Sequence, residues 1–250
     1  MQQYLTLTRR ELGSFFLSFT GYVVIAAATF LMGLSFVSLL AKLKGEATPM
    51  PLTELFYMTD YFWFILLFSA PVVTMRLFSL EKYSGTFETL MTAPVSDLQV
   101  VLAKFSAAQI FYLVMWSPLI GFITALRYFA HDPNLLDPGA LGGTFLGIFL
   151  LGAVYMSLGC FASALTRSQI VAAMTSFVIG VSLFIMNYLA DKFPLEKSWT
   201  TDVLNYISMP EHMQNFSRGI VDTRHVIFYV ALTAFFLFLT LRVVESRRWK

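Results

Sequence analysis

The sequence predicts an all-α integral membrane protein, a single transmembrane domain over residues 1–250 with six helical spans. Of the 250 residues, 57% are hydrophobic and 13% are charged, whereas soluble domains average roughly 45–50% apolar and 25% charged residues. Six apolar runs contain no Asp, Glu, Lys, Arg or His. Because these runs are continuous rather than alternating, they predict membrane helices and not the strands of a barrel.

The six runs cover residues 16–40, 61–75, 105–126, 141–165, 170–189 and 226–241. A helix needs about 20 apolar residues to cross a hydrocarbon core about 30 Å thick. The second and sixth runs are shorter than this, so we expect them to extend into flanking apolar residues such as Leu77, Phe78, Leu80 and Val243. Two prolines, Pro71 and Pro118, predict kinks in the second and third spans.

Residues 1–15 predict an amphipathic helix at the membrane interface. One helical face collects Tyr4, Leu5, Thr8, Leu12, Phe15 and Phe16, and the charged residues Arg9, Arg10 and Glu11 fall elsewhere. A frayed tail is the alternative. No small-residue cleavage site follows, so we expect the first span to be retained and not removed as a signal peptide.

The basic residues predict that both termini are cytoplasmic. With six spans, ten Lys and Arg residues lie on the side of the termini and seven on the other side. Four of those seven lie in the long segment between the fifth and sixth spans, and long segments count less under the positive-inside rule. We therefore expect a multi-pass protein of the inner (cytoplasmic) membrane whose surroundings are the lipid bilayer.

Composition also argues against several classes of function. The net charge of +2 comes from scattered basic residues, which argues against nucleic-acid binding. The single Cys160 lies within an apolar run, which excludes a disulfide framework or a cysteine-based zinc site within one chain. The absence of ionisable residues from the spans argues against an ion-coupled carrier. The amides of Gln109 and Asn187 are expected to form hydrogen bonds between helices.

Small residues recur every fourth position in the fourth and fifth spans. They are Gly139, Gly143 and Gly147 in one set, and Ala172, Ser176 and Gly180 in the other. This spacing lets helix backbones approach closely, so it predicts helix-packing faces. The pattern leaves open whether the partner helix belongs to the same chain or to a second subunit.

The polar joint between the second and third spans predicts a short helix of about two turns. Gly85 ends the preceding helix, and Pro94 ends the short one. The next helix is expected to begin at a capping box formed by Ser96 and Gln99.

The short helix is amphipathic. Phe87, Leu90 and Met91 repeat at one-turn spacing among charged residues. We expect this apolar face to fill a cleft on a soluble partner, with Glu81, Lys82 and Glu88 around the rim. A helix that lies at the lipid headgroups is the alternative.

The same joint resembles a known family. The run of Glu81, Gly85, Thr86, Glu88, Leu90 and Pro94 is similar to the signature of ABC type-2 permeases, the membrane subunits of a class of ATP-driven exporters. The opening Arg10-Glu11-Leu12, the segment 210–219 and the ending Arg247-Arg248-Trp249 agree with this likeness, which covers the whole chain. The closest resemblance is to the branch that includes the gliding-motility permease GldF.

The resemblance implies that segment 81–94 contains a coupling helix, which docks on a cytoplasmic ABC ATPase. The residues implied in coupling are Glu81, Lys82, Gly85, Thr86, Phe87, Glu88, Leu90, Met91 and Pro94. It also implies a second permease subunit, as a homodimer or a heterodimer. The chain has no Walker A pattern, so we expect no cofactor in it, and ATP and Mg would be bound by the partner ATPase.

The segment 191–224 between the fifth and sixth spans is too long for a simple turn. Pro210 suits the start of a helix and Gly219 its end, which predicts a short helix over 211–218. Trp199, Tyr206 and Phe216 could seat it at the outer interface. The resemblance implies an external gate with Pro210, Phe216 and Gly219. A passive loop is the alternative.

No catalytic constellation is evident in the sequence, so we expect a subunit that is not itself an enzyme. His131, His212 and His225 lack the i, i+4 spacing and the nearby cysteines of a zinc site, so no metal is expected. The predicted function is the permease subunit of an ABC exporter. The alternative is a non-transporting membrane scaffold, or an anchor subunit of a larger envelope or motility complex.

Overall fold

All the regular elements in the described part of the chain are α-helices. The computed structural model describes residues 2–42, 52–57, 59–92, 95–130, 137–192 and 206–246. The helices are α1 (Gln2–Phe16), α2 (Phe19–Lys42), α3 (Leu52–Tyr57), α4 (Asp60–Thr74), α5 (Ser79–Ser84), α6 (Thr86–Thr92), α7 (Asp97–Trp116), α8 (Pro118–Ala130), α9 (Pro138–Leu165), α10 (Gln169–Lys192), α12 (Met209–Ser217) and α13 (Thr223–Ser246).

Five helical stretches of the described chain are long and apolar enough to cross a membrane. They are Phe19–Ala41, Asp60–Ser84, Asp97–Tyr128, Pro138–Leu165 and Thr223–Ser246. The predicted helical membrane bundle is thereby confirmed, and the second span does extend beyond residue 75 as expected. The remaining expected span corresponds to α10, of which the stretch Gln169–Ile185 is apolar but shorter than the other five.

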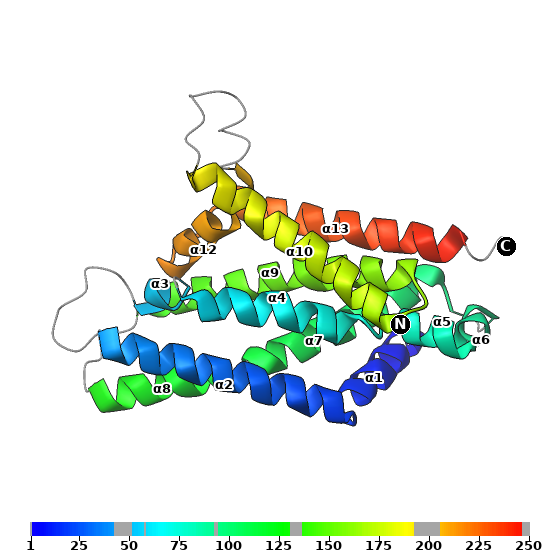
Figure 1. Ribbon diagram of the computed structural model, residues 1–250, viewed down its shortest axis with the longest axis horizontal. Helices are drawn as coiled ribbons and strands as arrows, with labels where there is room; N and C mark the ends of the chain where they lie inside the picture. Colours follow the sequence, from blue (N-terminus) through cyan, green and yellow to red (C-terminus); the bar gives the residue numbers. More distant parts are fainter. Residues whose placement is uncertain are drawn as a thin grey trace.

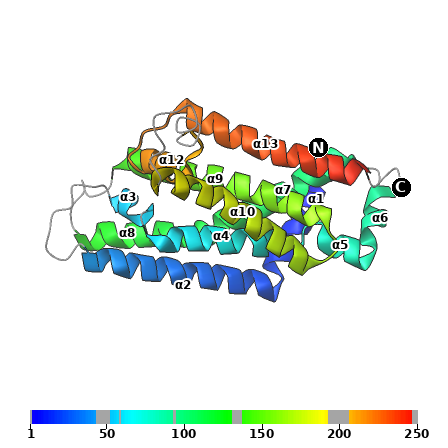
Figure 2. The same cartoon turned by 45° about the horizontal axis from the view of Figure 1, so that its top comes forward.

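The long helices run side by side, and the short helices gather at the two ends of the bundle (Figures 1 and 2). At one end lie α1, α5, α6 and the last turns of α13, and we call this the terminal end. At the opposite end, the distal end, lie α3 and α12. Helix α9 lies at the centre, in contact with α4, α7, α10, α12 and α13.

Local sequence signals set several helix boundaries. The predicted capping box is present, because the Ser96 hydroxyl accepts a hydrogen bond from the Gln99 amide and the Gln99 side chain accepts one from the Ser96 amide. Pro118 separates α7 from α8, since proline lacks an amide hydrogen and its ring clashes with the preceding turn. Pro71 lies inside α4, which ends at Thr74.

The N-terminal segment is a helix packed on α7 rather than a frayed tail. The Tyr4 hydroxyl donates to Ser106 Oγ at 2.7 Å. The Phe15 ring stacks on Phe111 with centroids 5.0 Å apart. The expectation that α1 lies at the membrane interface stays a prediction. The ending Arg247-Arg248-Trp249 lies outside the described residues.

Some interhelical contacts were predicted from the sequence. Gln109 Nε2 donates to the Phe149 carbonyl at 3.0 Å and so joins α7 to α9, as expected from the sequence. The Asn187 side chain lies outside the described part of the structure. In the fifth-span set, Ala172 and Ser176 are buried. A Cβ placed on Gly180 would lie 3.0 Å from Tyr155 Cε1, so this glycine lets α10 approach α9 closely.

Candidate functional site

The joint between α4 and α7 contains two short helices separated by a glycine, and the second of them, α6, is the short helix predicted after Gly85. Helix α5 ends at Gly85, whose φ of 76° is left-handed, and α6 begins at Thr86. A left-handed residue is accommodated by glycine at little steric cost, so Gly85 allows the sharp change of direction between α5 and α6. The side chains of Leu90 and Met91, and all of Pro94, lie outside the described residues.

The end of α9 fixes the turn that leads from α4 into α5. The Ser163 hydroxyl accepts hydrogen bonds from the amides of Phe78 and Ser79, both at 3.1 Å, and donates to the Met75 carbonyl at 3.1 Å. Lys82 Nζ donates to the Ala164 carbonyl. One serine and one lysine therefore attach the start of this joint to the central helix.

Phe87 faces the interior of its own chain. It is buried in the core, and the Lys82 ammonium lies 5.2 Å from the centre of its ring. This placement differs from the sequence expectation, in which Phe87 fills a cleft on a partner and Lys82 lies at the rim. Burial of the ring, together with the cation–π contact, stabilises the inward orientation. Glu88 and Thr86 are exposed, so they are available to a partner.

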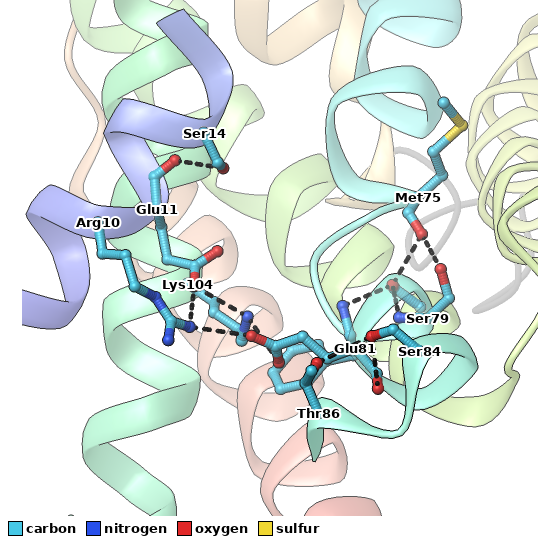
Figure 3. Close-up of polar contacts among 11 residues, drawn as sticks. Arg10, Glu11, Ser14, Met75, Ser79, Glu81, Ser84, Thr86 and Lys104 are labelled. Carbon is cyan, nitrogen blue, oxygen red and sulfur yellow. Dashed lines mark hydrogen bonds and ion pairs between the residues drawn. The ribbon is translucent and has the colours of Figure 1, made fainter. Parts of the chain in front are cut away.

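Four charged side chains from three helices form a cluster beside this joint, which we call the ion cluster (Figure 3). Arg10 Nη2 lies 2.8 Å from Glu11 Oε1 and 2.9 Å from Glu81 Oε1. Lys104 Nζ lies 3.1 Å from Glu11 Oε1 and 3.0 Å from Glu81 Oε2. The cluster contains two cations and two anions, and it joins α1, α5 and α7.

Burial makes the ion cluster a strong mechanical connection. The Lys104 side chain is only 2% exposed, so its charge needs both carboxylates to offset the loss of hydration. Removing one member of a buried pair typically costs about 3–5 kcal/mol, because the other charge is left uncompensated. Movement of α5 relative to α1 or α7 would therefore cost free energy unless the three helices move together.

Sequence reasoning did not find the ion cluster. Glu81 was expected to face a partner, and Lys104 was counted only among the ten basic residues on the side of the termini. Residues 11 and 104 are 93 positions apart, and residues 10 and 81 are 71 apart. Spacing rules that relate residues a few positions apart cannot predict such contacts. The sequence does show that Lys104 directly precedes an apolar run, and a lysine buried at such a position needs an acidic partner.

At the distal end, α12 forms the short helix predicted from Pro210 and Gly219. Pro210 lies in its first turn, and Gly219 follows its end with a φ of 79°. Buried Glu54 of α3 accepts hydrogen bonds from Arg218 Nε and Nη2 at 2.8 and 2.7 Å, and from Gln214 Nε2 at 2.6 Å. The Arg218 guanidinium holds the pKa of Glu54 below its ordinary value. Trp199 lies outside the described residues.

The glycine set of α9 forms the seat for α12. A Cβ on Gly143 would lie 2.1 Å from the Phe216 carbonyl oxygen, and one on Gly147 would lie 2.8 Å from Met213 Cε. A Cβ on Gly219 would lie 3.1 Å from the carbonyl carbon of Gly139. The predicted packing face therefore receives a helix of the same chain, and Phe216 is buried against it. Its role as an external gate stays a prediction.

Two histidines that are 13 positions apart meet between α12 and α13. The rings of His212 and His225 stack with centroids 3.9 Å apart. Burial, with a further contribution from His225, lowers the pKa of His212 to about 4. His131 lies outside the described residues. Within the ranges that the structure describes, no group of three or more His, Cys, Asp or Glu side chains converges in a way that could hold a metal ion.

Comparison with known families assigns the chain. The family model described as ABC-2 family transporter protein matches residues 23–244, which include α5, α6, Glu81 and Lys104 but not Arg10 or Glu11. No curated protein matches the chain. The family match covers most of the sequence and agrees with the all-helical membrane bundle. The protein therefore belongs to the ABC-2 transporter family, whose members are the membrane permease components of ABC transporters.

Proposed function

We propose that this chain is the permease subunit of an ABC exporter in the inner membrane. It would convert ATP hydrolysis by a separate cytoplasmic ATPase into movement of a substrate, with ATP and Mg bound only by that partner. The observation that carries the proposal is the buried ion cluster, which connects the α5–α6 joint to span α7 and to α1. A push on the joint would be transmitted directly to a membrane helix.

The proposed topology has six crossings with the terminal end in the cytoplasm. The crossings are α2, α4, α7 with α8, α9, α10 and α13, and short α5 and α6 join the second to the third. This arrangement leaves α1, α6 and the end of α13 at one face, consistent with the excess of basic residues expected there. The distal helix α12 would then lie at the external face, as a gate.

In the proposed coupling contact, exposed Glu88 of α6 meets the ATPase while buried Phe87 holds α6 on its own chain. The partner would thus push on a helix that is anchored from behind by Lys82, Ser163 and the ion cluster. In this arrangement a charged residue contacts the ATPase, whereas the apolar residue packs on its own chain and not in a cleft of the partner. All the contacts that hold α6 and α5 in place are made within this chain, which supports coupling through rigid attachment.

The proposal includes a second permease subunit, either another copy or a related chain. The glycine set of α9 is filled by α12, so pairing would use another face. The GldF-like branch and a role in gliding motility stay predictions from the likeness of the joint to that branch.

The test separates docking from coupling. The chain is co-expressed with a candidate ABC ATPase from the same genome, and Glu88→Lys is compared with Glu211→Lys, since Glu211 is exposed at the distal end. We expect Glu88→Lys to reduce co-purification of the ATPase about tenfold, because a rim charge is reversed, and Glu211→Lys to leave it unchanged. Glu81→Gln should keep the ATPase bound but lower transport-coupled ATP hydrolysis.

Unchanged co-purification in Glu88→Lys would remove the docking role of α6. Normal coupling in Glu81→Gln, with the protein folded, would remove the role of the ion cluster. If no ATPase co-purifies with the wild-type chain, the scaffold alternative takes the place of the exporter.

A further inference from the structure

A cleft of about 680 Å³ opens at the terminal end between α1, α2, α4, α5 and α7. Its lining is divided by chemistry. Cations from three parts of the chain, Arg10, Arg76 and Lys104, contribute to its polar part. The polar part also contains Glu11 and Glu81, the carboxylates of the ion cluster, and hydroxyl side chains that include Ser18 and Thr20. The remaining lining is an apolar wall that includes Val24 of α2 and Val72 of α4. A space with charge at one side and an apolar wall at the other suits an amphipathic ligand.

Arg76 differs from the other two cations of the cleft. Arg10 and Lys104 each lie close to two carboxylates in the ion cluster. The Arg76 guanidinium donates instead to neutral oxygens, to Thr20 Oγ1 at 3.0 Å, Gln169 Oε1 at 3.3 Å and Ser18 Oγ at 3.4 Å. Among the residues with described side chains, no carboxylate lies within ion-pair distance of Arg76. Its positive charge is therefore not neutralised by those residues.

The surroundings of Arg76 favour an anion. Ser18 and Thr20 lie at the start of α2, a helix of 24 residues, and the N-terminus of a helix carries a partial positive charge that attracts anions. Their hydroxyl groups are hydrogen-bonded to each other, with Ser18 Oγ 2.6 Å from Thr20 Oγ1. One of the two donates in this bond, which leaves the hydrogen of the other for a ligand bound at the guanidinium. Arginine matches the geometry of phosphate oxygens, which it can bind with two parallel hydrogen bonds.

The cleft also lies at the depth of a membrane surface. The residues on either side of Ser18 carry large apolar side chains that are almost fully exposed, Leu17 at 88% and Phe19 at 82%. In a protein that spans a bilayer, neighbouring large apolar side chains with this exposure favour contact with lipid or another apolar surface. The level of Ser18 is therefore the level at which lipid headgroups meet acyl chains.

We infer that this cleft binds a membrane phospholipid, with its phosphate at Arg76, Ser18 and Thr20 and an acyl chain along Val24 and Val72. The bound lipid would join the start of α2 to the turn after α4, and through Gln169 to the start of α10. This site depends on membrane embedding and not on the direction of transport or on the ATPase. If no phospholipid binds here, the proposed permease function is unaffected.

The test uses the full chain, purified in a nonionic detergent and stripped of lipid. It is titrated with phosphatidylglycerol, with diacylglycerol carrying the same acyl chains, or with inorganic phosphate alone. Binding is measured by native mass spectrometry and by the shift in apparent Tm, which rises when a ligand binds only the folded state. The matched control is Arg242→Gln, because Arg242 is an exposed arginine at the same end that pairs with Glu245.

We expect phosphatidylglycerol to raise the apparent Tm more than diacylglycerol does, and inorganic phosphate to have almost no effect. In Arg76→Gln the affinity for phosphatidylglycerol should fall about tenfold, because a charge-assisted hydrogen bond is lost. Arg242→Gln should bind like the wild type. Thr20→Val, which keeps the side-chain size, should also weaken the binding of phosphatidylglycerol. Its lipid-free Tm should stay near that of the wild type. If Arg76→Gln does not fold, the Thr20→Val variant provides the test.

Equal affinity in Arg76→Gln or Thr20→Val and the wild type would overturn the proposal. Equal shifts with phosphatidylglycerol and diacylglycerol would show that the phosphate is not bound. A shift reproduced by inorganic phosphate alone would show a site for free anions, and would overturn the lipid as its occupant.

Discussion

At the scale of single residues, His212 joins a helix at the end of the bundle to a membrane span. Its ring is 1% exposed and stacks on His225 of α13. The neutral imidazole fits this place, whereas the protonated ring would be a buried cation next to a second basic ring. The contact between α12 and α13 therefore depends on the charge of one side chain.

The pH dependence of stability follows from that residue. The pKa of His212 is lowered in the folded state to about 4 from an ordinary value of 6.5. The unfolded chain therefore binds a proton first, so the stabilisation is complete above about pH 6.5 and is lost as the pH falls toward 4. We expect the apparent Tm of the purified protein to fall over this range, and His212→Phe to reduce that fall.

The carboxylate of Glu54 serves as an internal reference in the same titration. Its pKa is lowered in the folded state from the ordinary 4.5, so its contribution is complete above that pH and is lost only in more acidic solution. A change between pH 6.5 and 4.5 can therefore be assigned to histidine. Identical pH profiles for His212→Phe and the wild type would show that His212 makes no contribution.

Residue-scale contacts were the part of the site that the sequence could not predict. Glu81 pairs with Lys104 of α7, and Glu54 pairs with Arg218, the residue after α12, from 164 positions away. A single sequence contains no measure of such distant proximity. Phe87 shows a second limit, because an apolar residue on a short amphipathic helix has the same pattern whether it faces its own core or a partner.

At the scale of helices, local rules predicted more. Gly85, Gly219 and the capping box at Ser96 mark boundaries that the structure confirms, since each acts through backbone geometry within a few residues. Pro118 was predicted to kink the third span, and in the structure it separates α7 from α8. The six-span pattern gave the long helices and their order. The sequence pattern could not predict that α12 docks on the glycines of α9, because small residues at that spacing are equally compatible with contact with a second subunit.

The docking of α12 is testable at Gly143. A Cβ there would lie 2.1 Å from a backbone oxygen of α12, whereas a Cβ on neighbouring Gly142 would meet nothing within 4 Å. We expect Gly143→Ala to destabilise the protein by about 1–3 kcal/mol, as overpacking does. Gly142→Ala should be neutral or stabilising by about 0.5–1 kcal/mol, because alanine favours the helix.

The measurement is thermal unfolding, together with hydrogen exchange of the amides in α12. Exchange in α12 should accelerate in Gly143→Ala and stay unchanged in Gly142→Ala. If the two variants unfold alike and exchange alike, the seat on α9 is not what holds α12.

At the scale of the whole molecule, the two ends of the bundle are built differently. The terminal end carries the ion cluster and the α5–α6 joint, and the distal end carries the contact between α3 and α12 (Figure 1). The only cysteine of the chain, Cys160, is buried. New cysteines can therefore report the side of the membrane on which each end lies.

We expect Tyr83→Cys to react only with a membrane-permeant thiol reagent, and Glu211→Cys to react with an impermeant reagent added outside. Both positions are exposed, and they lie at opposite ends of the bundle. The wild-type chain, with only its buried cysteine, gives the background. The proposed topology places three crossings between the two positions, α7 with α8, α9 and α10. Labelling of both variants from outside would contradict this odd number and the cytoplasmic placement of the terminal end.

Helix α9 reaches from one end of the molecule to the other. Its 28 residues span about 42 Å at 1.5 Å per residue. Near one tip its glycines carry α12, and at the other tip Ser163 and Ala164 hold the turn before α5. A hydrogen-bonded helix resists stretching, so it acts as a rod: an axial displacement at the distal end is passed on to the terminal end. The two ends of the bundle thus share a mechanical link that lies within one helix.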